Sequence, residues 1–357
     1  MQKHTVIGLG LLGGLLVIAA FVASMHPENA ALPGNVPNIP ASSTSSSGTP
    51  SGLPVMADFM PAFTGITHWW NTPDGQPLTP EKLRGKVVLV DFWTYSCINC
   101  IRTYPFLKAM QEKYADKGLV IVGVHTPEFA FEAVPANVGD AIAKNGLLYP
   151  VALDPDYGTW NAYHNQYWPA EYLFDAQGRL RHVHYGEGEY DQSEQAIRVL
   201  LGETAHAGLG DMADIATPDL SKINTPETYF GLSRGNAFSG TTGPSGKDAT
   251  YTAGSSVQPN RWSADGTWQF QDEYVESRSV GAVFRMSVQA DQMHIVMSSA
   301  DGLDKHIEIY VDGTKTGEQV VNASQLYNIA SFPDAKRHVV EIRIREAGVR
   351  FFATTFS

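Results

Sequence analysis

The stretch KVVLVDFW at residues 86–93 constrains the fold of this chain more than any other. It is an almost unbroken run of apolar and β-branched residues, which is typical of a strand buried on both faces of a sheet. In residues 98–117, which follow, apolar side chains recur at the three- and four-residue spacing of a helix. Gly118 is expected to end this helix. A second apolar run lies at residues 119–125. Strand, helix and strand in this order predict a right-handed parallel crossover.

Further elements are predicted on both sides of this unit. They are a strand, a helix, a hairpin around Asp-Ala-Gln-Gly and a final helix, at residues 66–71, 131–146, 171–186 and 191–202. Asp191 is expected to cap the final helix. We therefore predict an α/β domain with one central sheet over residues 59–203.

The C-terminal part of the chain has a different character. After residues 204–222, which we interpret as a linker, the helical period disappears. Asp-Gly pairs at 265–266, 301–302 and 312–313 separate runs in which polar and apolar residues alternate. Such regular turn signals predict an all-β sandwich of the jelly-roll-like kind over residues 223–357.

The N-terminal part begins with an apolar segment. Residues 5–25 are 21 uncharged residues, and as a helix they would span about 31 Å, close to the roughly 30 Å of a bilayer core. We predict that residues 1–25 form a transmembrane anchor, with a cleaved signal peptide as the alternative. Because Lys3 precedes the run, the rest of the chain is expected outside the cytoplasm. A Pro- and Ser-rich linker follows at residues 26–58.

Charge and glycine pattern exclude several classes of function. The 357 residues carry a formal net charge of −12, so we do not expect nucleic acid as a partner. The glycines at residues 8–14 lie inside the apolar N-terminal run. A phosphate or dinucleotide loop would instead lie between a strand and a helix.

Both cysteines of the chain, Cys97 and Cys100, lie at the junction of the first buried strand and its helix. Cys97 is expected at the helix N-terminus, where free backbone N–H groups and the helix dipole stabilise a thiolate. Cys100 is expected one turn further along on the same side, sheltered and close enough to resolve a mixed disulfide. Disulfide exchange requires this asymmetry between an exposed nucleophile and a second thiol.

Other roles for the cysteine pair have less support from the residues. A structural disulfide would close a loop of only four residues, which is worth about 2 kcal/mol. A zinc site needs two more ligands, and the chain has no second Cys-x-x-Cys. A copper carrier needs only the two cysteines and one histidine, for which His125 is the candidate, and this alternative stays open. The main prediction contains no metal site and no cofactor.

Five segments occur in an order that a known family shares. They are VVLVDFWTYSCINCIRTYPFL, VGVHTPEFAFE, YPVALDPDYGTWNAYHNQYWPAEYLFDAQG, GEGEYD and TPETYFGLSRG. The set resembles the exported thioredoxin-like thiol–disulfide oxidoreductases of the TlpA/ResA-like group, and most closely the extracytoplasmic part of DipZ-type proteins. The resemblance covers residues 59–357. It implies a thioredoxin-like domain, with an insertion at 127–150, followed by a carbohydrate-binding-module-like sandwich.

The resemblance implies roles for four residues. Cys97 and Cys100 match the nucleophilic and resolving cysteines, which together form the redox disulfide. Asp91 matches the buried acid that assists proton transfer at the resolving cysteine, and burial would raise its pKa as a proton shuttle needs. The alternative for Asp91 is a strand-end acid bonded to a backbone amide. Pro169 matches the cis-proline that faces the disulfide and offers backbone pairing to a substrate.

Four more aromatic residues are candidates for contact with a protein substrate. Trp93, Tyr95 and Trp168 would form an apolar rim, with a place in the core as the alternative for some of them. His125 ends a parallel strand, at the edge where ligands gather in open α/β sheets. A hydrogen-bonded structural histidine is the alternative there.

The aromatic residues of the last domain have two interpretations. Trp262, Trp268 and Tyr251 would stack on sugar rings if they were exposed, whereas aromatic residues of a sandwich usually form its core. We therefore expect a docking module for a glycan, a cell-wall component or another partner, without assigning a glycan site.

The chain also departs from the family pattern around the cysteines. Ser96 stands where thioredoxin-like sites usually have Trp, and Thr103 stands where the ResA-like pattern has a glutamate. The pair between the cysteines is Ile98 and Asn99. Each change affects thiolate stabilisation or substrate contact, so the redox potential and the direction of the reaction do not transfer.

The sequence therefore predicts a membrane-tethered, extracytoplasmic thiol–disulfide oxidoreductase in a bacterial cell envelope. Its substrates would be protein thiols and disulfides, in cytochrome c maturation or in oxidative protein quality control. A membrane electron donor would be needed for a reducing role. The alternatives are a copper-handling thiol carrier and a wall- or glycan-binding protein with a passive thioredoxin-fold scaffold.

Overall fold

The computed structural model describes residues 52–204, 208–254, 256–334 and 336–357. All of them belong to one compact unit, Pro50–Ser357. The predicted anchor or signal at residues 1–25, and the predicted linker up to residue 51, lie outside the described residues. Within the described ranges, no helix is both long and apolar enough to cross a bilayer.

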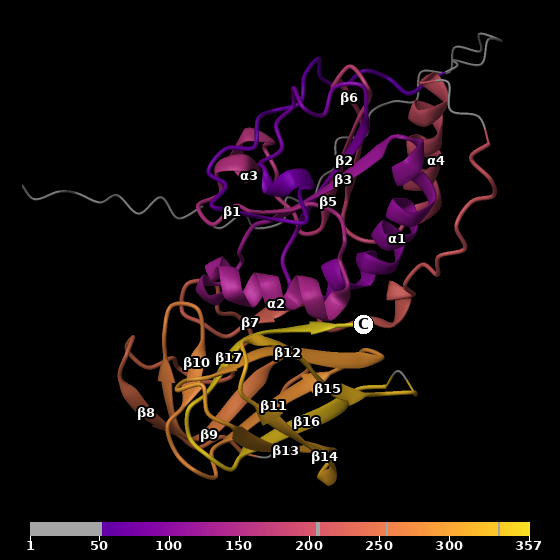
Figure 1. Cartoon of the computed structure of the whole chain (residues 1–357). Coiled ribbons are helices and arrows are strands. Elements are labelled where there is room, and N and C mark those ends of the chain that lie inside the picture. Colours follow the sequence, from indigo (N-terminus) through magenta and orange to yellow (C-terminus); the bar gives the residue numbers. More distant parts are fainter. Residues whose placement is uncertain (1–51, 205–207, 255, 335) are drawn as a thin grey trace, which may run out of the picture. The chain divides into compact units, whose positions relative to one another are not determined.

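A six-stranded sheet forms the centre of the first domain (Figure 1). The strands are β1 (His68–Trp70), β2 (Val87–Trp93), β3 (Leu119–His125), β4 (Val151–Leu153), β5 (Ala170–Phe174) and β6 (Leu180–Tyr185). Their order in the sheet is β1-β4-β3-β2-β5-β6. The β2–β3 and β3–β4 pairs are parallel and the other pairs are antiparallel. The predicted parallel crossover and the predicted hairpin of β5 and β6 are thus confirmed.

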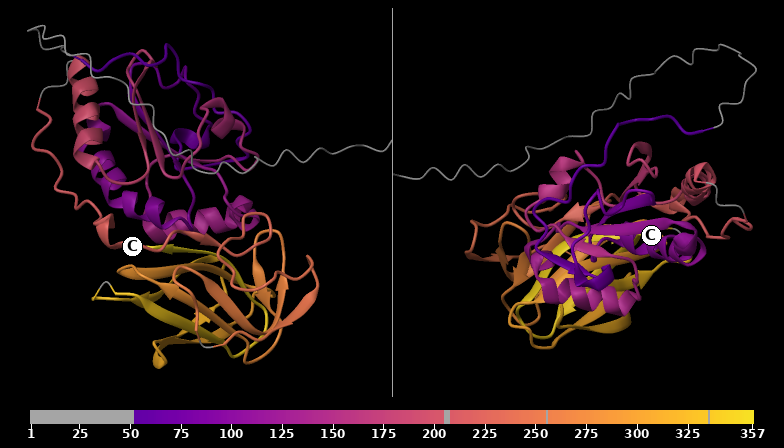
Figure 2. Two further views of the ribbon diagram at one scale, coloured as in Figure 1. Left: turned by 180° about the vertical axis from the view of Figure 1, so that it is seen from behind. Right: turned by 45° about the horizontal axis from the view of Figure 1, so that its top comes forward.

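Helices cover both faces of this sheet. The described helices are α1 (Ile98–Tyr114), α2 (Pro135–Asn145), α3 (Gly158–Ala162), α4 (Tyr190–Glu203), and the short 3₁₀ helices η1 (Pro73–Gly75), η2 (Ala115–Lys117), η3 (Ala130–Ala133) and η4 (Leu220–Lys222). In Figures 1 and 2, α1 and α4 lie together on one side of the sheet, and in Figure 1 α3 lies on the other. Gly118, with φ of 97°, ends the helical segment where predicted.

Strand β2 is buried on both faces, as its sequence predicts. Its odd-numbered apolar side chains pack in a cluster with α1 and α4, and its even-numbered ones pack in a cluster that contains Trp160 of α3. Because side chains alternate along a strand, Asp91 points to the α1 side. The acid therefore lies beneath the helix that carries both cysteines.

The start of α4 differs from the prediction. The helix begins at Tyr190, and Glu189 occupies the N-cap position in a left-handed conformation, with φ of 50° and no capping side-chain hydrogen bond. Asp191 is therefore inside the first turn and is not the cap. The turn through Gly188, with φ of 92°, brings the chain into the helix at a different angle from an extended N-cap.

The end of the predicted N-terminal linker is also more ordered than expected. The backbone N–H of Met56 donates to Leu180 O at 2.8 Å, and Leu180 N donates to Ala57 O at 2.9 Å. The guanidinium of Arg181 donates to the carbonyl of Leu53. The reason is that β6 is an edge strand, whose free backbone groups accept this segment.

The predicted second linker lies against the first domain where it is described. Arg198 of α4 donates to Gly210 O at 2.8 Å. Ala213 N donates to the carboxylate of Glu194, also on α4, at 2.7 Å. Side chains of α4 thus hold the segment that leads to the second domain.

The second domain is a β-sandwich or barrel of antiparallel strand pairs. Its strands are β7 (Thr228–Tyr229), β8 (Asp248–Tyr251), β9 (Trp262–Phe270), β10 (Val275–Ser277), β11 (Val283–Val288), β12 (Gln292–Ser299), β13 (Lys305–Val311), β14 (Thr314–Val321), β15 (Gln325–Ser331), β16 (His338–Ile344) and β17 (Val349–Phe356). Nine of them follow the order β14-β13-β16-β11-β9-β10-β17-β12-β15, while β7 pairs with β17 and β8 with β9. The predicted all-β class is confirmed.

One predicted turn of this domain is instead a bend within a strand. Asp265 and Gly266 lie in the middle of β9. Residues up to Asp265 pair with β11, and residues from Gly266 onward pair with β8. Gly266 has φ of 86°, and a Cβ there would lie 3.0 Å from Ala282 Cα. Glycine lets one strand contribute to both layers of the domain.

Candidate redox site

The two cysteines occupy the start of α1. Cys97 is the N-cap residue, with φ of −78° and ψ of 118°, and its Sγ accepts a hydrogen bond from Cys100 N at 3.4 Å. The two are not bonded to each other; Cys97 is partly exposed and Cys100 is buried. Burial raises the pKa of the Cys100 thiol well above its usual value, and the neighbouring Cys97 raises it further. The structure thus has one accessible sulfur and one sheltered sulfur.

Asp91 lies on β2 beneath this helix. Its side chain is fully buried, and burial raises its pKa well above the usual range, with a further contribution from Glu171. Neither carboxylate oxygen has a hydrogen-bond partner among the described residues. The alternative of an acid bonded to a backbone amide therefore finds no support. Asp91 is among the charges that raise the pKa of Cys100.

A second buried acid, which sequence reasoning did not single out, faces Asp91. Glu171 is paired with Asp91 across the β2–β5 ladder. Burial raises the pKa of Glu171 to about 7, and Ser193 Oγ on α4 donates to its carboxylate at 3.0 Å. The available signal was a charged residue inside the otherwise apolar strand AEYLF.

Trp93 belongs to the core and not to a substrate rim. It is 0% exposed and packs in the α1-side cluster. A Cβ on Gly123 would lie 2.9 Å from Trp93 Nε1 and 3.0 Å from Tyr149 Cε2. The missing side chain at Gly123 therefore makes room for both rings. The rim prediction was wrong for Trp93 because the last residue of β2 still lies under α1.

His125 and Tyr95 are also buried. His125 Nε2 lies 3.2 Å from Tyr95 N, which donates to it, and the Tyr95 ring stacks on the imidazole at 5.7 Å. Burial lowers the pKa of His125 to about 3, so the ring is neutral. Tyr95 Oη donates to Ser324 O at 3.1 Å. Both residues fit the structural alternative, and neither forms an exposed rim.

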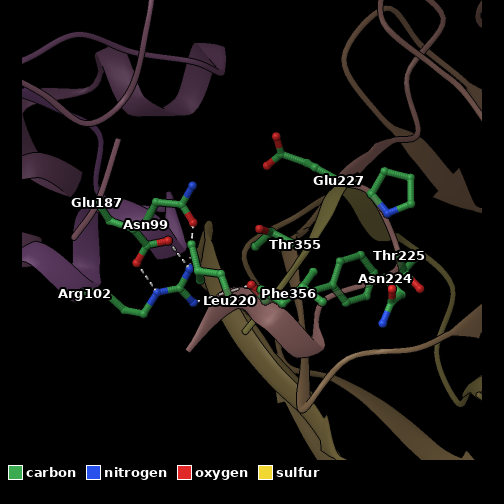
Figure 3. Close-up of a pocket in the computed structure, with 11 residues that line it drawn as sticks. Asn99, Arg102, Glu187, Leu220, Asn224, Thr225, Glu227, Thr355 and Phe356 are labelled. Atoms are coloured by element: carbon green, nitrogen blue, oxygen red, sulfur yellow. Dashed lines mark hydrogen bonds and ion pairs between the residues drawn. The ribbon is translucent and has the colours of Figure 1, made fainter. Parts of the chain in front are cut away.

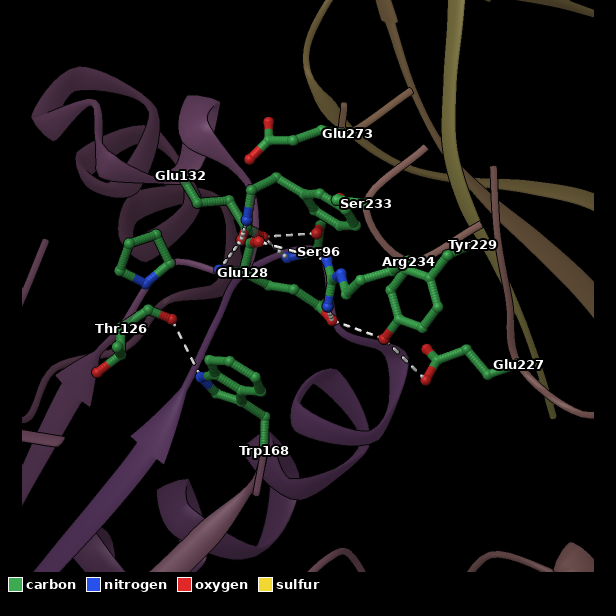
Figure 4. Close-up of polar contacts among 12 residues, drawn as sticks. Ser96, Thr126, Glu128, Glu132, Trp168, Glu227, Tyr229, Ser233, Arg234 and Glu273 are labelled. Carbon is green, nitrogen blue, oxygen red and sulfur yellow. Dashed lines mark hydrogen bonds and ion pairs between the residues drawn. The ribbon is translucent and has the colours of Figure 1, made fainter. Parts of the chain in front are cut away.

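Trp168 is the one predicted rim residue that keeps partial exposure. Its Nε1 donates to Thr126 O at 3.0 Å (Figure 4), directly after the end of β3. The Trp168–Pro169 peptide bond is cis. Pro169 itself is buried, and its carbonyl accepts from Gly186 N at 2.9 Å. The role of Pro169 in pairing with a substrate stays a prediction.

Ser96, which replaces the usual tryptophan, contacts another buried acid that the sequence did not reveal. Ser96 Oγ donates to Glu132 Oε1 at 2.6 Å (Figure 4). Glu132 is 0% exposed, and burial raises its pKa to about 7. The only local signal was its position three residues after Phe129, the capping-box spacing at the start of η3.

The segment around η3 also contacts the second domain. Glu128 accepts hydrogen bonds from Tyr229 Oη at 2.6 Å and from Arg234 at 2.9 Å (Figure 4). Phe129 packs in a cluster with Phe352 of β17. The inserted segment of the first domain thus meets residues of the second.

A pocket lies beside the cysteine motif. It has a volume of about 390 Å³. Arg102 lines it, pairs with Glu187 and donates to Asn99 Oδ1 at 2.8 Å (Figure 3). The other lining residues are Leu220 of the segment between the domains and residues of the second domain, among them Glu227 and Phe356.

Two further expectations concern metals and glycans. Across the described ranges, no group of three or more His, Cys, Asp or Glu side chains is placed to hold a metal ion. Trp262 and Trp268 are buried in the core of the second domain, with their indole N–H groups bonded to Asn236 O and Asp265 O. These two rings are therefore not free to stack on a sugar.

Comparison with known proteins covers both domains. The Redoxin family matches residues 56–200, and the thioredoxin-like C-terminal domain family matches residues 225–357. The protein DipZ of Mycobacterium bovis is 40% identical over 275 residues, which are 74% of this chain and 39% of DipZ. The chain thus spans about two fifths of the length of that relative.

Two shorter proteins match the first domain. The thiol–disulfide oxidoreductase YkuV of Bacillus subtilis is 34% identical over 146 residues, which are 41% of this chain and 95% of YkuV. The solution structure of a thioredoxin-like protein in the oxidised form is 32% identical, with a TM-score of 0.38. It covers 41% of this chain and 97% of its own.

Proposed function

Because this chain belongs to the family of thioredoxin-like thiol–disulfide oxidoreductases, we propose that it exchanges disulfides with protein substrates through Cys97 and Cys100. The observation that carries the proposal is the arrangement at α1, with a partly exposed sulfur at the N-cap and a buried sulfur one turn inside. At that position Cys97 Sγ accepts a hydrogen bond from Cys100 N at 3.4 Å, so the accessible sulfur lies at the first turn of α1.

The exchange is a balanced two-electron reaction. The Cys97 thiolate attacks a substrate disulfide, so a mixed disulfide forms and one substrate thiolate leaves. Cys100 then loses its proton and attacks the Cys97 sulfur, which releases the second substrate thiolate and closes the Cys97–Cys100 disulfide. The protein loses two electrons, and the substrate becomes a dithiol after taking up two protons. The reverse sequence oxidises a substrate dithiol.

Asp91 is proposed as the group that takes the proton of Cys100. Burial raises the pKa of both groups, so their proton affinities change in the same direction. A positioned side chain that accepts a proton as the reaction proceeds acts as a general base. Ionised Asp91 accepts the proton as Cys100 attacks, and it returns the proton when the pair is reduced again.

The setting of the reaction is part of the proposal. We place it outside the cytoplasm, with residues 5–25 as the anchor or signal, because of their apolar composition and the position of Lys3. Cytochrome c maturation and oxidative protein quality control are the proposed processes, with a membrane electron donor for a reducing role. The copper-carrier and glycan-binding alternatives gain no support from the site or from the relatives.

Trapping tests this function. In cells, Cys100→Ser should accumulate mixed disulfides between Cys97 and substrates, visible on non-reducing gels and identified by mass spectrometry. A Cys97→Ser control should show none. The full-length protein should also reduce a disulfide substrate in the presence of a thiol donor. Absence of both adducts and activity overturns the proposal.

A further inference from the structure

The acid Glu132 is bound to the residue that precedes the nucleophile. Its Oε1 accepts from Ser96 Oγ at 2.6 Å and lies 3.4 Å from Ser96 N. Its Oε2 accepts from Glu128 N at 2.6 Å and Phe129 N at 2.9 Å. One oxygen thus caps η3, while the other holds the turn that presents Cys97. A role in capping alone accounts for only half of these contacts.

Three of the four partners are backbone N–H groups, which can only donate, and the fourth is the Ser96 hydroxyl, which donates here. An ionised carboxylate can only accept hydrogen bonds, so it matches four donors. A protonated carboxyl group carries its own O–H, which only Ser96 Oγ can accept, because the three backbone N–H groups cannot; protonation therefore reverses the hydrogen bond to Ser96. Ionised Glu132 therefore holds Ser96 with charge-assisted hydrogen bonds, and protonation replaces them with a weaker neutral bond.

We propose that Glu132 is the positioning residue of the redox site: through Ser96 it holds the turn that presents Cys97, and its charge makes the reactivity of Cys97 depend on pH. This inference rests on the proposed function, because it concerns the same thiol, that of Cys97. It assigns a role to an acid in the inserted segment, in a chain whose Thr103 stands where the ResA-like pattern has its acid.

The charged and polar neighbours of Glu132 determine where it titrates. Those that face it are Ser96, Thr94, Tyr95, Glu128 and Tyr157. Burial is the main cause that raises its pKa to about 7, and the charge of Glu128 raises it further. Hydrogen bonds from Ser96, Phe129 and Thr94 lower it. From the second domain, Arg234 pairs with Glu128, and Glu273 accepts from Ala130 N at 3.1 Å.

The expected effect on Cys97 follows from charge. As the pH rises through about 7, Glu132 gains a negative charge where it is hydrogen-bonded to Ser96, the residue before Cys97, and a nearby negative charge disfavours a second one on sulfur. The rate of alkylation of Cys97 should therefore rise less steeply with pH than a single thiol titration predicts. Removal of the charge should increase the rate at pH 8 by about threefold to tenfold.

The test measures the alkylation rate of Cys97 by iodoacetamide between pH 5 and 9, in the full chain with Cys100→Ser so that one thiol reacts. With Glu132 unchanged, the plot of alkylation rate against pH should show an extra inflection near pH 7, and Glu132→Gln should abolish this inflection. Ser96→Ala removes a bond that lowers the pKa of Glu132, so the inflection should move up by about half a unit or more. Glu128→Gln removes a charge that raises this pKa, so the inflection should move down.

Glu171→Gln is the matched control and should keep the inflection, because burial raises the pKa of Glu171 to about 7 as well but its carboxylate is bonded to Ser193 and not to Ser96. The inference is overturned if the inflection is missing with Glu132 present, persists in Glu132→Gln, or disappears only in Glu171→Gln. If Ser96→Ala does not fold, the downward shift of the inflection in Glu128→Gln still tests the inference. Disulfide reductase activity of the protein with both cysteines is assayed separately, so loss of the proposed function is distinguishable from loss of this inference.

Discussion

At the scale of single residues, three buried carboxyl groups lie near the candidate redox site. Asp91 and Glu171 face each other across β2 and β5 beneath the cysteines, and Glu132 contacts the residue before Cys97. Burial raises the pKa of each of them. Buried acids with raised pKa values cluster at sites of proton transfer, which agrees with the chemistry proposed for Cys100.

Asp91→Asn should slow the resolving step. Asparagine has nearly the same shape but cannot accept the proton of Cys100, and general base catalysis of this kind contributes about 10²-fold or more. Rapid-quench experiments should therefore show a mixed disulfide that accumulates and decays about 10²-fold more slowly than in the unmodified protein. Decay at the normal rate would show that another group takes the proton.

Glu171→Gln should change how stability depends on pH. Folding raises the pKa of Glu171 from its usual 4.5 to about 7, so the protonated form is favoured in the fold. The resulting stability is present below about pH 4.5 and is lost as the pH rises through about 7. Between pH 4.5 and 8, the unfolding free energy of the variant should therefore fall by about 3 kcal/mol less than that of the parent.

Urea unfolding at several pH values measures this difference. Asp91 and Glu132 change the stability with pH in the same direction as Glu171. The variant is therefore compared with the parent protein, and only the difference in pH dependence between the two is interpreted. Parallel curves for parent and variant would contradict the prediction.

At the scale of elements, the packing of β2 beneath α1 depends on how closely β3 approaches. Gly123 of β3 is paired with Asp91, and the rings of Trp93 and Tyr149 occupy the space where its side chain would be. The large side chains of one strand are accommodated by the smallest residue of the next. The position of the acid under α1 thus depends on a glycine in another element.

Gly123→Ala should destabilise the first domain by about 1–3 kcal/mol, because the added Cβ would overlap with Trp93 and Tyr149. Gly202→Ala in α4 is a matched control, since no atom lies within 4 Å of its Cβ position. There alanine favours the helix and should leave stability unchanged or slightly higher. Thermal unfolding of both variants checks the prediction, and equal effects would contradict it.

At the scale of the whole described unit, the second domain contacts the segment that carries Glu132. Phe129 and Phe131 pack edge-on against Phe352, with ring centroids at 5.3 Å and 4.9 Å. Arg234 and Tyr229 bind Glu128. We infer that the sandwich stabilises the inserted segment, and through it the turn before Cys97.

Phe352→Ala should therefore loosen residues 128–132 as well as the sandwich. Loss of a buried phenylalanine costs about 3–5 kcal/mol, and amide hydrogen exchange in this segment should become faster. Val280→Ala, at a residue that is 73% exposed, is the control and should change nothing. Unchanged exchange at residues 128–132 in a folded Phe352→Ala protein would show that the domain does not support the segment.

The sequence by itself determined the features that depend on local pattern. The strand at 87–93, the helix that starts at Ile98 and the placement of Cys97 and Cys100 follow from a doubly buried apolar run and from helical spacing. The all-β class of the second domain follows from alternation and turn residues. Each of these signals extends over a few neighbouring residues, so it can be recognised from the sequence alone.

The tertiary structure alone decided the features that join distant residues. Ser96 and Glu132 are 36 positions apart, and Glu171 meets Asp91 only because β5 pairs with β2. Likewise, the burial of Trp93, Tyr95 and His125 depends on the elements that cover the end of the sheet. The physical reason is that the pKa and exposure of a side chain depend on what packs against it, and no local pattern specifies that neighbour.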